Sequence, residues 1–462
     1  MTHVIRRLEY QEIELGETPS DDQLSLLSAN EIINSASKFG CTREGEWFTY
    51  KRTNNKVLKC GGWVGSIQGG DKQIEVRPKI ENDDGAETEV NLIELLIKAG
   101  VVDAEFREVS NLANRATAFE LLAIWYARKI SKECNRGLSR GYVAVADNIP
   151  NKRGQIDFSN EWRNKAQRRM LLACKFDDHN EDNQLNRILK AGLRAALSTQ
   201  AKLPESRMAL SNALKLLDGI TDVTVTAQNA FSYKPDRKDL RFKPLLKLAA
   251  RFISNKRHQD VRSSEEENNS EGLSIMWSAW RLFESLVFRE LSGENHDSIF
   301  TLSPKKWIIK NQVGGRHMIR RNGTKRGTDY ILKPDIIIYD QNMTPRVICD
   351  TKWKYDIRKS DEGDASVING KKGKYIVKKT DLYQMFAYSR YYATGDIIPS
   401  IALIYPSQNT ASPTKGDKGP LAALTKVDTL YFNIGEVESQ TKIDIYEFPV
   451  PTVTKSENHN AV

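Results

Sequence analysis

The stretch Lys333-Pro334-Asp335-Ile336-Ile337-Ile338-Tyr339, followed by Arg346-Val347-Ile348-Cys349-Asp350-Thr351-Lys352, decides the fold. Each half is an apolar run of strand length, and the residues between them, Asp-Gln-Asn-Met-Thr-Pro at 340–345, are typical of a turn. We therefore expect two adjacent antiparallel strands.

This hairpin gathers charged side chains of a particular kind. Side chains alternate across a strand, so Asp350 and Lys352 project from one face, and the hairpin brings Asp335 beside them. Mg²⁺ prefers oxygen ligands and is usually held by one or two carboxylates plus substrate phosphate, while an ammonium can orient a water or stabilise developing charge. The pattern Pro-Asp-x(14)-Asp-x-Lys resembles the PD-(D/E)XK nuclease signature, although an edge strand ending in surface charges gives the same string.

A helix predicted over residues 277–291 precedes the hairpin. Trp280, Glu284, Val287 and Leu291 follow i, i+4, i+7, i+11 spacing, which predicts that Glu284 lies on the apolar stripe facing the core. A carboxylate there is costly unless it is paired or bound to a metal. A buried ion pair would satisfy it, but the resemblance to the acidic residue on the first helix of this nuclease fold favours a supporting active-site role.

A second helix, predicted over residues 381–388, follows the hairpin. Gln384 and Tyr388 are four residues apart and share one face. Taken singly, each could be an ordinary core or surface residue. The pair resembles the Q-x-x-x-Y helix that borders the active site in one branch of the same nuclease superfamily. The order of these elements along the chain is more specific than any one of them: a helix with a glutamate, a Pro-Asp strand, an Asp-x-Lys strand, and a helix with the Gln/Tyr pair.

Composition excludes several classes of protein. The chain has 462 residues, of which 39% are hydrophobic and 28% charged, and no apolar run approaches the roughly 20 residues of a membrane span. No secretory signal is recognisable, so we expect a cytoplasmic protein without a membrane partner. The five cysteines and six histidines are scattered, which disfavours a disulfide framework, a structural zinc site and a Ser/His triad.

Basic charge is concentrated in one region. Residues 301–380 carry 19 Lys and Arg against 8 Asp and Glu, whereas the whole chain is only +9. The same region contains Trp307, Trp353, Tyr355 and Tyr375. A diffuse excess would indicate only a solvated surface, but this concentration favours a surface for a polyanion such as DNA.

The chain is predicted to be a multidomain α/β and α+β protein. We expect a β-rich N-terminal domain over 1–105, with strands at 47–50, 63–67 and 72–80 and a helix from Glu87 to Gly100. A mainly helical middle domain over 106–262 has helices at 119–127, 183–197 and 206–217 and a short β-like piece at 152–158. An acidic linker or loop at 263–273 leads to an α/β domain at 274–450, with a mixed central sheet flanked by helices, and a disordered tail at 451–462.

The assembled stretches resemble a named family, McrC, the nuclease subunit of McrBC-type modification-dependent restriction systems. The resemblance covers roughly residues 45–405. It rests on residues 63–67, 74–80, 152–156 (Lys-Arg-Gly-Gln-Ile), 177–190, and the run from Asp350-Thr351-Lys352-Trp353-Lys354 to Gln384 and Tyr388.

The resemblance implies a division of labour. The N-terminal portion would dock on a hexameric AAA+ GTPase partner similar to McrB and stimulate its hydrolysis, and the C-terminal restriction-endonuclease-like domain would cut double-stranded DNA carrying a modified base such as methylcytosine. GTP would reach the complex through the partner, because this chain has no G-x-x-x-x-G-K-[ST] string. The expected metal is Mg²⁺, with Mn²⁺ as a substitute. Carried over by residue, Asp335, Asp350 and Lys352 would be catalytic, Glu284, Gln384 and Tyr388 would support them, and Asp335, Asp350 and Thr351 would bind the metal.

Alternatives remain at this stage. A free-standing PD-(D/E)XK nuclease of DNA repair or recombination would cut without nucleotide or partner. A regulatory DNA-binding subunit with an idle nuclease fold is disfavoured by the intact Asp335, Asp350 and Lys352. A further set of polar residues could stabilise the fold or activate the partner's GTPase: Arg77, Lys79, Asn183, Asn186 and Arg187.

Overall fold

A computed structural model describes most of the chain. The described residues are 4–16, 19–34, 48–51, 54–69, 72–81, 87–110, 118–200, 203–262, 274–293, 307–313, 316–317, 331–353, 377, 379–408, 420–421, 424–432 and 441–453. They form two compact units: the first comprises residues 1–65, 72–107 and 276–462, and the second residues 66–71 and 108–275. Residues of the first and third predicted domains are thus grouped in one unit, and the assignment of separate domain roles remains a prediction.

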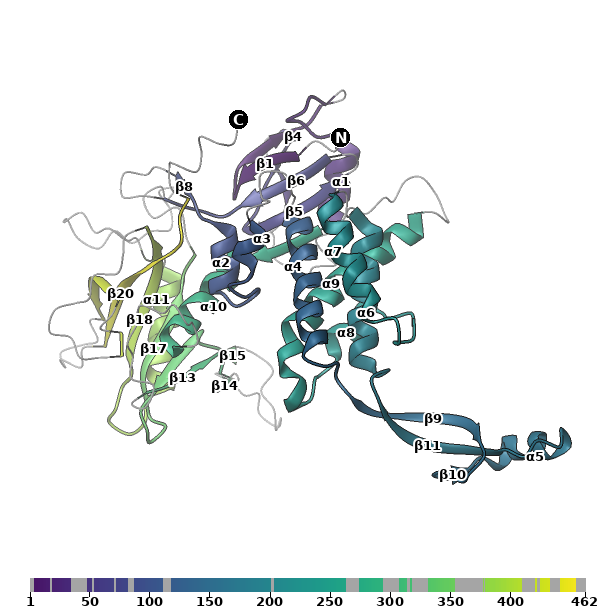
Figure 1. Cartoon of the computed structure of the whole chain (residues 1–462). Coiled ribbons are helices and arrows are strands. Elements are labelled where there is room, and N and C mark those ends of the chain that lie inside the picture. Colours follow the sequence, from purple (N-terminus) through teal and green to yellow (C-terminus); the bar gives the residue numbers. More distant parts are fainter. Residues whose placement is uncertain are drawn as a thin grey trace, which may run out of the picture. The chain divides into compact units, whose positions relative to one another are not determined.

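The first unit contains a six-stranded sheet (Figure 1). Its strands, in spatial order, are β13 (Ile308–Asn311), β16 (Ile336–Tyr339), β17 (Pro345–Thr351), β18 (Ser400–Ser407), β20 (Lys442–Pro449) and β19 (Thr425–Tyr431). β17, β18 and β20 run parallel, and the other neighbours are antiparallel. The predicted mixed sheet and its β16–β17 hairpin are confirmed, with Ile336 opposite Cys349.

Helices pack against this sheet. Met385 and Tyr388 of α11 (Lys379–Tyr391), and Tyr392 directly after it, are buried in one cluster with residues of β16, β17, β18 and β20. From α10 (Ala279–Ser292), the ring of Phe283 lies 6.1 Å from that of Phe448 in β20. The isoleucine-rich strands are therefore buried because apolar helix faces cover them.

The predicted apolar stripe of α10 is correct except at one end. Glu284, Val287 and Leu291 are buried, but Trp280 is 37% exposed. The buried face also includes Leu282, Phe283 and Leu286, so the stripe is centred away from Trp280. Glu284 nevertheless lies in the interior, as predicted.

The N-terminal part of the first unit is built from short strands and helices. They are β1 (Val4–Leu8), β2 (Glu12–Glu14), α1 (Leu26–Asn34), β3 (Thr49–Lys51), β4 (Asn54–Lys59), β5 (Trp63–Gly69), β6 (Lys72–Arg77), β7 (Lys79–Glu81), β8 (Glu87–Glu89), α2 (Leu92–Lys98) and α3 (Phe106–Ser110). β1, β6, β5 and β12 (Ser274–Ser278) form one sheet, in that order, with β1 parallel to β6. Two small ladders, β2–β4–β3 and β7–β8, complete this part, and β14 (Arg316–His317) pairs with β15 (Ile331–Leu332).

One predicted helix begins later than the sequence pattern suggested. Residues 87–89 form strand β8, which pairs with β7, rather than the start of a helix. The helix begins after Asn91, whose side chain accepts hydrogen bonds from the N–H groups of Ile93 and Glu94 and so caps α2. The predicted stop is confirmed, because Gly100 has a φ of +73°, a conformation that suits glycine at a helix end.

The second unit is mainly helical, as predicted. Its elements are α4 (Ala118–Asn135), α6 (Gln184–Gln200), α7 (Pro204–Lys215), α8 (Ala227–Ser232), the 3₁₀ helix η2 (Arg237–Phe242) and α9 (Lys243–Arg262). Gly192 of α6 permits close packing, because a Cβ atom there would lie 2.5 Å from the Tyr126 hydroxyl and 2.8 Å from the Ala249 Cβ.

A long hairpin extends from these helices (Figure 1). β9 (Gly141–Ile149) pairs antiparallel with β11 (Leu172–Asn180) along its whole length, and β10 (Gln155–Ile156) and α5 (Phe158–Ala166) lie at its far end. We refer to residues 141–180 as the arm. Only the piece at 152–158 was predicted as β structure, because neither face of β9 is buried and its alternation lacks a strong apolar signal.

Several sequence predictions fall outside the described residues. These are the linker at 263–273, the tail from residue 454, Tyr355, Tyr375 and most of the basic region between 301 and 380. Residues 451–453 are described and pair with the β8 region, through Asn91 N–H to the Pro451 carbonyl and Val453 N–H to the Glu89 carbonyl. Cys60, Cys134, Cys174 and Cys349 are free thiols. No helix in the described part is both long and apolar enough to cross a bilayer.

Candidate active site

The β16–β17 hairpin places Asp335 against the end of its partner strand. Asp335 directly precedes β16, and its Oδ2 accepts hydrogen bonds from both the main-chain N–H and the hydroxyl of Thr351, each at 2.8 Å. These bonds fix one carboxylate oxygen, and the other forms no hydrogen bond with a residue that the structure describes. The Thr351 hydroxyl is thus engaged in orienting Asp335.

Asp350 and Lys352 lie side by side at the end of β17, as the alternation predicted. The Lys352 ammonium forms an ion pair with Asp350 Oδ2, and its Nζ lies 3.6 Å from Asp381 Oδ1 and 3.5 Å from Gln384 Oε1. Asp350 is only 3% exposed. The lysine is therefore held between two carboxylates from different elements, β17 and α11.

Burial and like charge raise the pKa values of both aspartates. Burial is the largest effect on Asp350, followed by repulsion from Asp335; attraction to Lys352 offsets part of it, and the pKa rises to about 6. For Asp335, burial again raises the pKa first and the Glu284 carboxylate adds to it. Burial lowers the pKa of Lys352, but Asp350 and Asp381 outweigh that effect, so its pKa is raised and the ammonium stays charged. Two neighbouring carboxylates repel each other when both are ionised, so a cation bound between them would stabilise the ionised pair.

Glu284 reaches the same region from α10. The Gln312 side-chain amide donates a hydrogen bond to Glu284 Oε1. Burial raises the pKa of Glu284, and the nearby Asp350 charge raises it further. Glu284 is thus electrostatically linked to both aspartates, and within the described part of the chain its buried carboxylate is satisfied by an amide rather than by an ion pair.

Gln384 and Tyr388 border the cluster from α11. The Gln384 amide nitrogen lies 2.7 Å from the Tyr388 hydroxyl and donates to it, while its Oε1 faces Lys352. Tyr388 is buried, and burial followed by the Asp350 charge raises its pKa. The structure therefore brings all the residues singled out from the sequence to one place: Glu284, Asp335, Asp350, Thr351, Lys352, Gln384 and Tyr388.

Two further residues of the cluster were not singled out from the sequence. Asp381 pairs with Lys352, and Gln312 of the β13 end holds Glu284. Asp381 is three residues before Gln384 and so on the same helix face, which could have indicated it. Gln312 carries no such signal, since only the tertiary fold brings it to α10.

Trp353 is not a surface aromatic, contrary to the prediction that it contributes to a polyanion surface. Its ring lies 5.4 Å from that of Phe283, and its indole N–H donates to the Glu9 carboxylate, with oxygens at 3.1 and 3.3 Å. Glu9 is fully buried. The residue next to Lys352 is thus fixed by the N-terminal segment of the chain.

The donor set fits a hard divalent cation. Asp350 Oδ2 forms an ion pair with Lys352 but accepts no hydrogen bond of good geometry from a described residue. Thr351 binds only one of the two carboxylate oxygens of Asp335. The described residues contain no cluster of three or more His, Cys, Asp or Glu side chains arranged as a metal cage. A Mg²⁺ site does not require one, because two carboxylates, water and substrate phosphate suffice.

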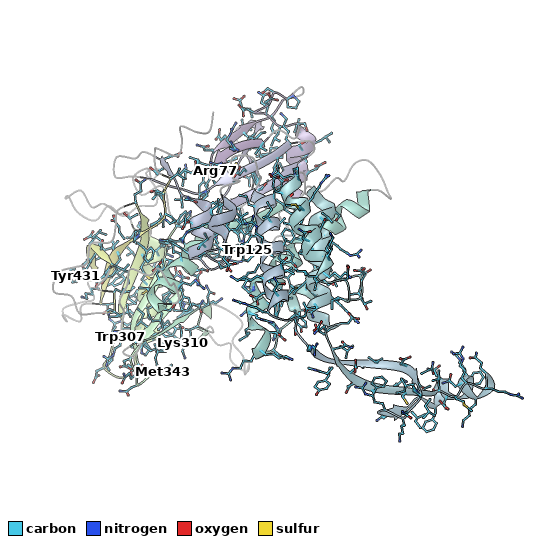
Figure 2. The ribbon with its side chains drawn as sticks, in the orientation of Figure 1. Arg77, Trp125, Trp307, Lys310, Met343 and Tyr431 are labelled. Atoms are coloured by element: carbon cyan, nitrogen blue, oxygen red, sulfur yellow. The ribbon has the colours of Figure 1, made fainter. Side chains whose placement is uncertain are left out.

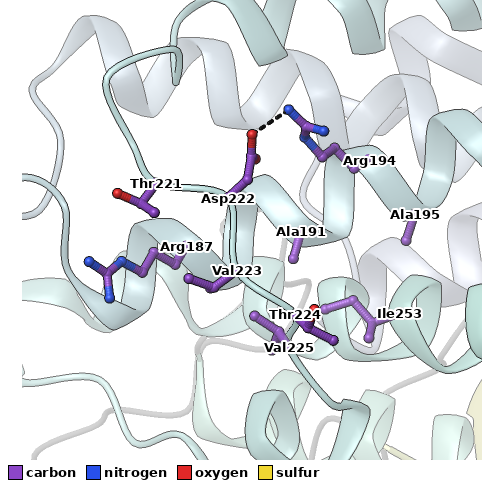
Figure 3. A pocket seen from close by; sticks show the side chains of 10 residues that line it. All are labelled: Arg187, Ala191, Arg194, Ala195, Thr221, Asp222, Val223, Thr224, Val225 and Ile253. Carbon is purple, nitrogen blue, oxygen red and sulfur yellow. Dashed lines mark hydrogen bonds and ion pairs between the residues drawn. The ribbon is translucent and has the colours of Figure 1, made fainter.

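A cavity of about 330 Å³ lies in the second unit, between α6, α9 and residues 221–225 (Figure 3). Its two guanidinium groups are engaged: Arg194 lies 2.5 Å from Asp222, and Arg187 makes two 2.8 Å hydrogen bonds to Asp182. The hydrogen bonds that Arg187 donates to Asp182 are the main reason why the pKa of this carboxyl lies well below its usual value. Both positive charges in the cavity wall are therefore paired with aspartates of the same unit, so we assign the cavity a structural role and not a ligand-binding one.

The polar residues left open by the sequence have structural partners. Asn183 and Asn186 both donate to the Ser139 carbonyl, at 2.7 and 2.9 Å, and so tie the start of α6 to the base of the arm. Arg77 pairs with Glu75 and Glu89, and Lys79 with Glu87. Through these contacts, and through the bonds from Arg187 to Asp182, all five residues help to stabilise the fold.

Comparison with known proteins agrees with this architecture. Residues 58–406 match the family described as McrBC 5-methylcytosine restriction system component. The curated protein "Type IV methyl-directed restriction enzyme EcoKMcrBC" of Escherichia coli (strain K12) is 28% identical over 179 residues, which is 37% of this chain and 49% of that protein. The chain thus spans about half the length of that relative.

The fold is also similar to a solved one. The solved structure is a refined half-complex from a tetradecameric assembly of Thermococcus gammatolerans McrB AAA+ hexamers with bound McrC. A chain in it matches with a TM-score of 0.58 at 17% identity, covering 98% of this chain and 97% of that one. The chain therefore belongs to the family of McrBC restriction system components, which confirms the resemblance drawn from the sequence.

Proposed function

We propose that this chain is the McrC-type nuclease subunit of a modification-dependent restriction complex and hydrolyses DNA phosphodiester bonds in a Mg²⁺-dependent reaction at the Asp335–Asp350–Lys352 site. The observation that carries the proposal is the buried pair of aspartates with raised pKa values, ion-paired to a lysine at the end of β17. Membership of the restriction family supports a nuclease role, and the order of the site along the chain supports the PD-(D/E)XK class.

Each residue has a part that follows from its contacts. Asp335 and Asp350 would hold Mg²⁺, or Mn²⁺ in its place, together with the main-chain carbonyl of Thr351, since the Thr351 hydroxyl already orients Asp335. When bound, Mg²⁺ supplies Lewis-acid polarisation of the scissile phosphate. Lys352, kept charged by Asp350 and Asp381, would stabilise negative charge that develops on the phosphate.

The remaining residues would set the geometry. Glu284, whose pKa is raised, would help to hold the attacking water and accept its proton. Gln384 links Lys352 to Tyr388, and this chain of contacts would restrict the lysine to one position.

We further propose that the chain acts with an AAA+ GTPase hexamer similar to McrB, which binds GTP and recognises modified double-stranded DNA. In the assembly of similar fold, McrC is bound to McrB AAA+ hexamers. By analogy, the N-terminal residues 1–105 would contribute to docking. The contact from Glu9 to Trp353, adjacent to Lys352, supports a physical link between this segment and the nuclease site.

The experiment that tests the proposal compares cleavage of methylated and unmethylated plasmid by the chain alone and with its AAA+ partner, GTP and Mg²⁺. The proposal expects cleavage only of methylated plasmid with partner and GTP, and loss of cleavage when EDTA replaces Mg²⁺. Equal cleavage of both plasmids by the chain alone would favour the free-standing repair nuclease, and no cleavage under any condition would favour the idle-fold subunit.

A further inference from the structure

A turn follows strand β1 and carries a buried carboxylate. The turn comprises Leu8, Glu9, Tyr10 and Gln11, and we refer to these four residues as the N-terminal turn. The Glu9 side chain is fully buried, although burying a charged carboxylate is costly unless polar partners stabilise it. The burial of Glu9 thus points to a contact in the interior that uses its carboxylate.

Hydrogen bonds hold the N-terminal turn in place. Glu9 N–H donates to the carbonyl of Arg77 in β6 at 3.0 Å (Arg77 is labelled in Figure 2), and Leu8 N–H donates to the Gln11 side chain at 2.9 Å. Tyr10 has a φ of +62°, a left-handed conformation that is uncommon for residues other than glycine. Such a conformation persists only where the surroundings fix it. The turn therefore presents the side chains of Glu9 and Tyr10 in definite positions.

Glu9 reaches the end of β17 through Trp353. The indole nitrogen of Trp353 donates to the Glu9 carboxylate, whose two oxygens lie 3.1 and 3.3 Å away. The residue before Trp353 is Lys352, whose main-chain N–H donates to the Ile404 carbonyl at 2.9 Å. The backbone at Lys352 is thus held by β18 on one side and by Glu9, through the adjoining indole, on the other.

The Trp353 ring also contacts the helix that carries Glu284. Its centroid lies 5.4 Å from that of the Phe283 ring, and Phe283 directly precedes Glu284 in α10. A displaced indole would therefore disturb the packing next to both Lys352 and Glu284.

Tyr10 links the N-terminal turn to the first residue of α10. A Cβ atom at Gly62 would lie 2.6 Å from the Tyr10 hydroxyl, so this hydroxyl packs directly against the main chain there. The Gly62 carbonyl accepts the N–H of Ala279 at 3.1 Å, where α10 begins. Both side chains of the turn thus lead to the nuclease site, Glu9 to the end of β17 and Tyr10 to the start of α10.

We propose that the N-terminal turn is a positioning element of the nuclease site, in which Glu9 holds Lys352 through Trp353 and Tyr10 holds the start of α10 through Gly62. Reacting groups must be held within about 0.5 Å of their productive geometry, and an error of about 1 Å can slow a reaction roughly 10²-fold. The inference rests on the proposed nuclease function, because the turn acts only through Lys352 and α10. Glu9 and Tyr10 are positioning residues and not catalytic ones.

The test measures single-turnover cleavage of methylated plasmid by the complete complex with the AAA+ partner, GTP and Mg²⁺, together with the affinity for DNA in EDTA. Glu9→Leu removes the acceptor, and Trp353→Phe removes the donor but keeps a ring against Phe283. Each variant should cleave about 10- to 100-fold more slowly, with an affinity for DNA within about twofold of the wild type. Because both changes break the same bond, the double variant should be no slower than the slower single variant. Glu9→Gln keeps an oxygen that can accept the indole N–H and should cleave within about threefold of the wild-type rate.

A second pair of variants tests the link through Tyr10. Gly62→Ala places a methyl group against the Tyr10 hydroxyl and should slow cleavage about tenfold. Tyr10→Phe removes that hydroxyl, so Gly62→Ala combined with Tyr10→Phe should cleave faster than Gly62→Ala alone. Losses that simply add in the combined variant would contradict the link.

Ser407→Ala is the matched control. It removes a hydrogen bond of 3.1 Å to the buried Glu447 carboxylate, between β18 and β20, which supply none of the site residues. We expect it to lower the melting temperature but to cleave at the wild-type rate. Thermal melting of every variant checks that it is folded at the assay temperature.

Three results would overturn the proposal. They are a Glu9→Leu variant that cleaves at the wild-type rate, a Glu9→Gln variant as slow as Glu9→Leu, and a Ser407→Ala control slowed as much as Glu9→Leu for the same loss of melting temperature. A wild-type complex that does not cleave would instead refute the proposed nuclease function, and this inference with it. The wild-type measurement therefore distinguishes the two failures.

Discussion

Replacing Asp350 with asparagine should stabilise the metal-free protein while it abolishes cleavage. Burial and Asp335 raise the pKa of Asp350 from 3.8 to about 6, so its ionised form is disfavoured in the folded state. About two pKa units correspond to roughly 3 kcal/mol of stability lost at pH 8, where the carboxylate is charged. Asparagine has a similar shape and no charge, and we expect Asp350→Asn to recover about 1 to 3 kcal/mol of that loss.

The sign of the pH dependence follows from the same shift. Between the unfolded pKa near 3.8 and the folded pKa near 6 the folded state binds more protons, so the wild type loses stability as pH rises through this window. The advantage of Asp350→Asn should therefore be full at pH 8 and nearly absent at pH 4.

Thermal unfolding in EDTA, followed by tryptophan fluorescence, measures this effect. We expect Asp350→Asn to melt roughly 5 °C higher than the wild type at pH 8. Saturating Mg²⁺ should raise the melting temperature of the wild type, because a ligand that binds only the folded state stabilises it, and should have little effect on the variant. A variant that melts lower in EDTA at pH 8, or that responds to Mg²⁺ as the wild type does, would refute this reasoning.

Three other substitutions have definite expected effects. Lys352→Gln should slow DNA cleavage by about 10² to 10³-fold in single-turnover assays yet keep the Mg²⁺-dependent rise in melting temperature, and an unchanged rate would exclude Lys352 from catalysis. Asp381→Asn removes one of the three carboxylates that raise the pKa of Lys352, so cleavage should fall roughly tenfold and the alkaline limb of its pH profile should move to lower pH; DNA affinity, measured by anisotropy, should not change. Gly192→Ala should lower the free energy of unfolding in urea by about 1 to 3 kcal/mol, because its methyl group would clash with Tyr126 and Ala249; wild-type stability would mean that α6 and α9 pack less closely than described.

The hairpin and the helices of the site could be predicted because their signals are local. The isoleucine run before Tyr339 and the turn residues before Arg346 specify β16 and β17, and strand alternation then places Asp350 with Lys352. Helix periodicity likewise placed Glu284 in the interior and Gln384 beside Tyr388.

Other parts depend on contacts that are distant in sequence. Gln312 meets Glu284 only after β13 joins the sheet. Trp353 packs against Phe283 and donates its indole N–H to Glu9, and both residues are distant from it in the sequence. The strands of the arm were not predicted, for a different reason. No residue of β9 is fully buried, and β11 buries only Ala173 and Cys174 near one end, so neither strand shows the strong alternation of apolar residues by which a sequence pattern reveals a strand.

The most direct test of the central claim uses the complete complex of this chain with its AAA+ partner, GTP, Mg²⁺ and methylated plasmid. DNA cleavage and GTP hydrolysis are measured in parallel for the wild type and for Asp350→Asn. We predict that the variant stimulates GTP hydrolysis as the wild type does but leaves the plasmid intact, because only the nuclease chemistry requires the second carboxylate. Cleavage by Asp350→Asn at the wild-type rate would contradict the proposed active site.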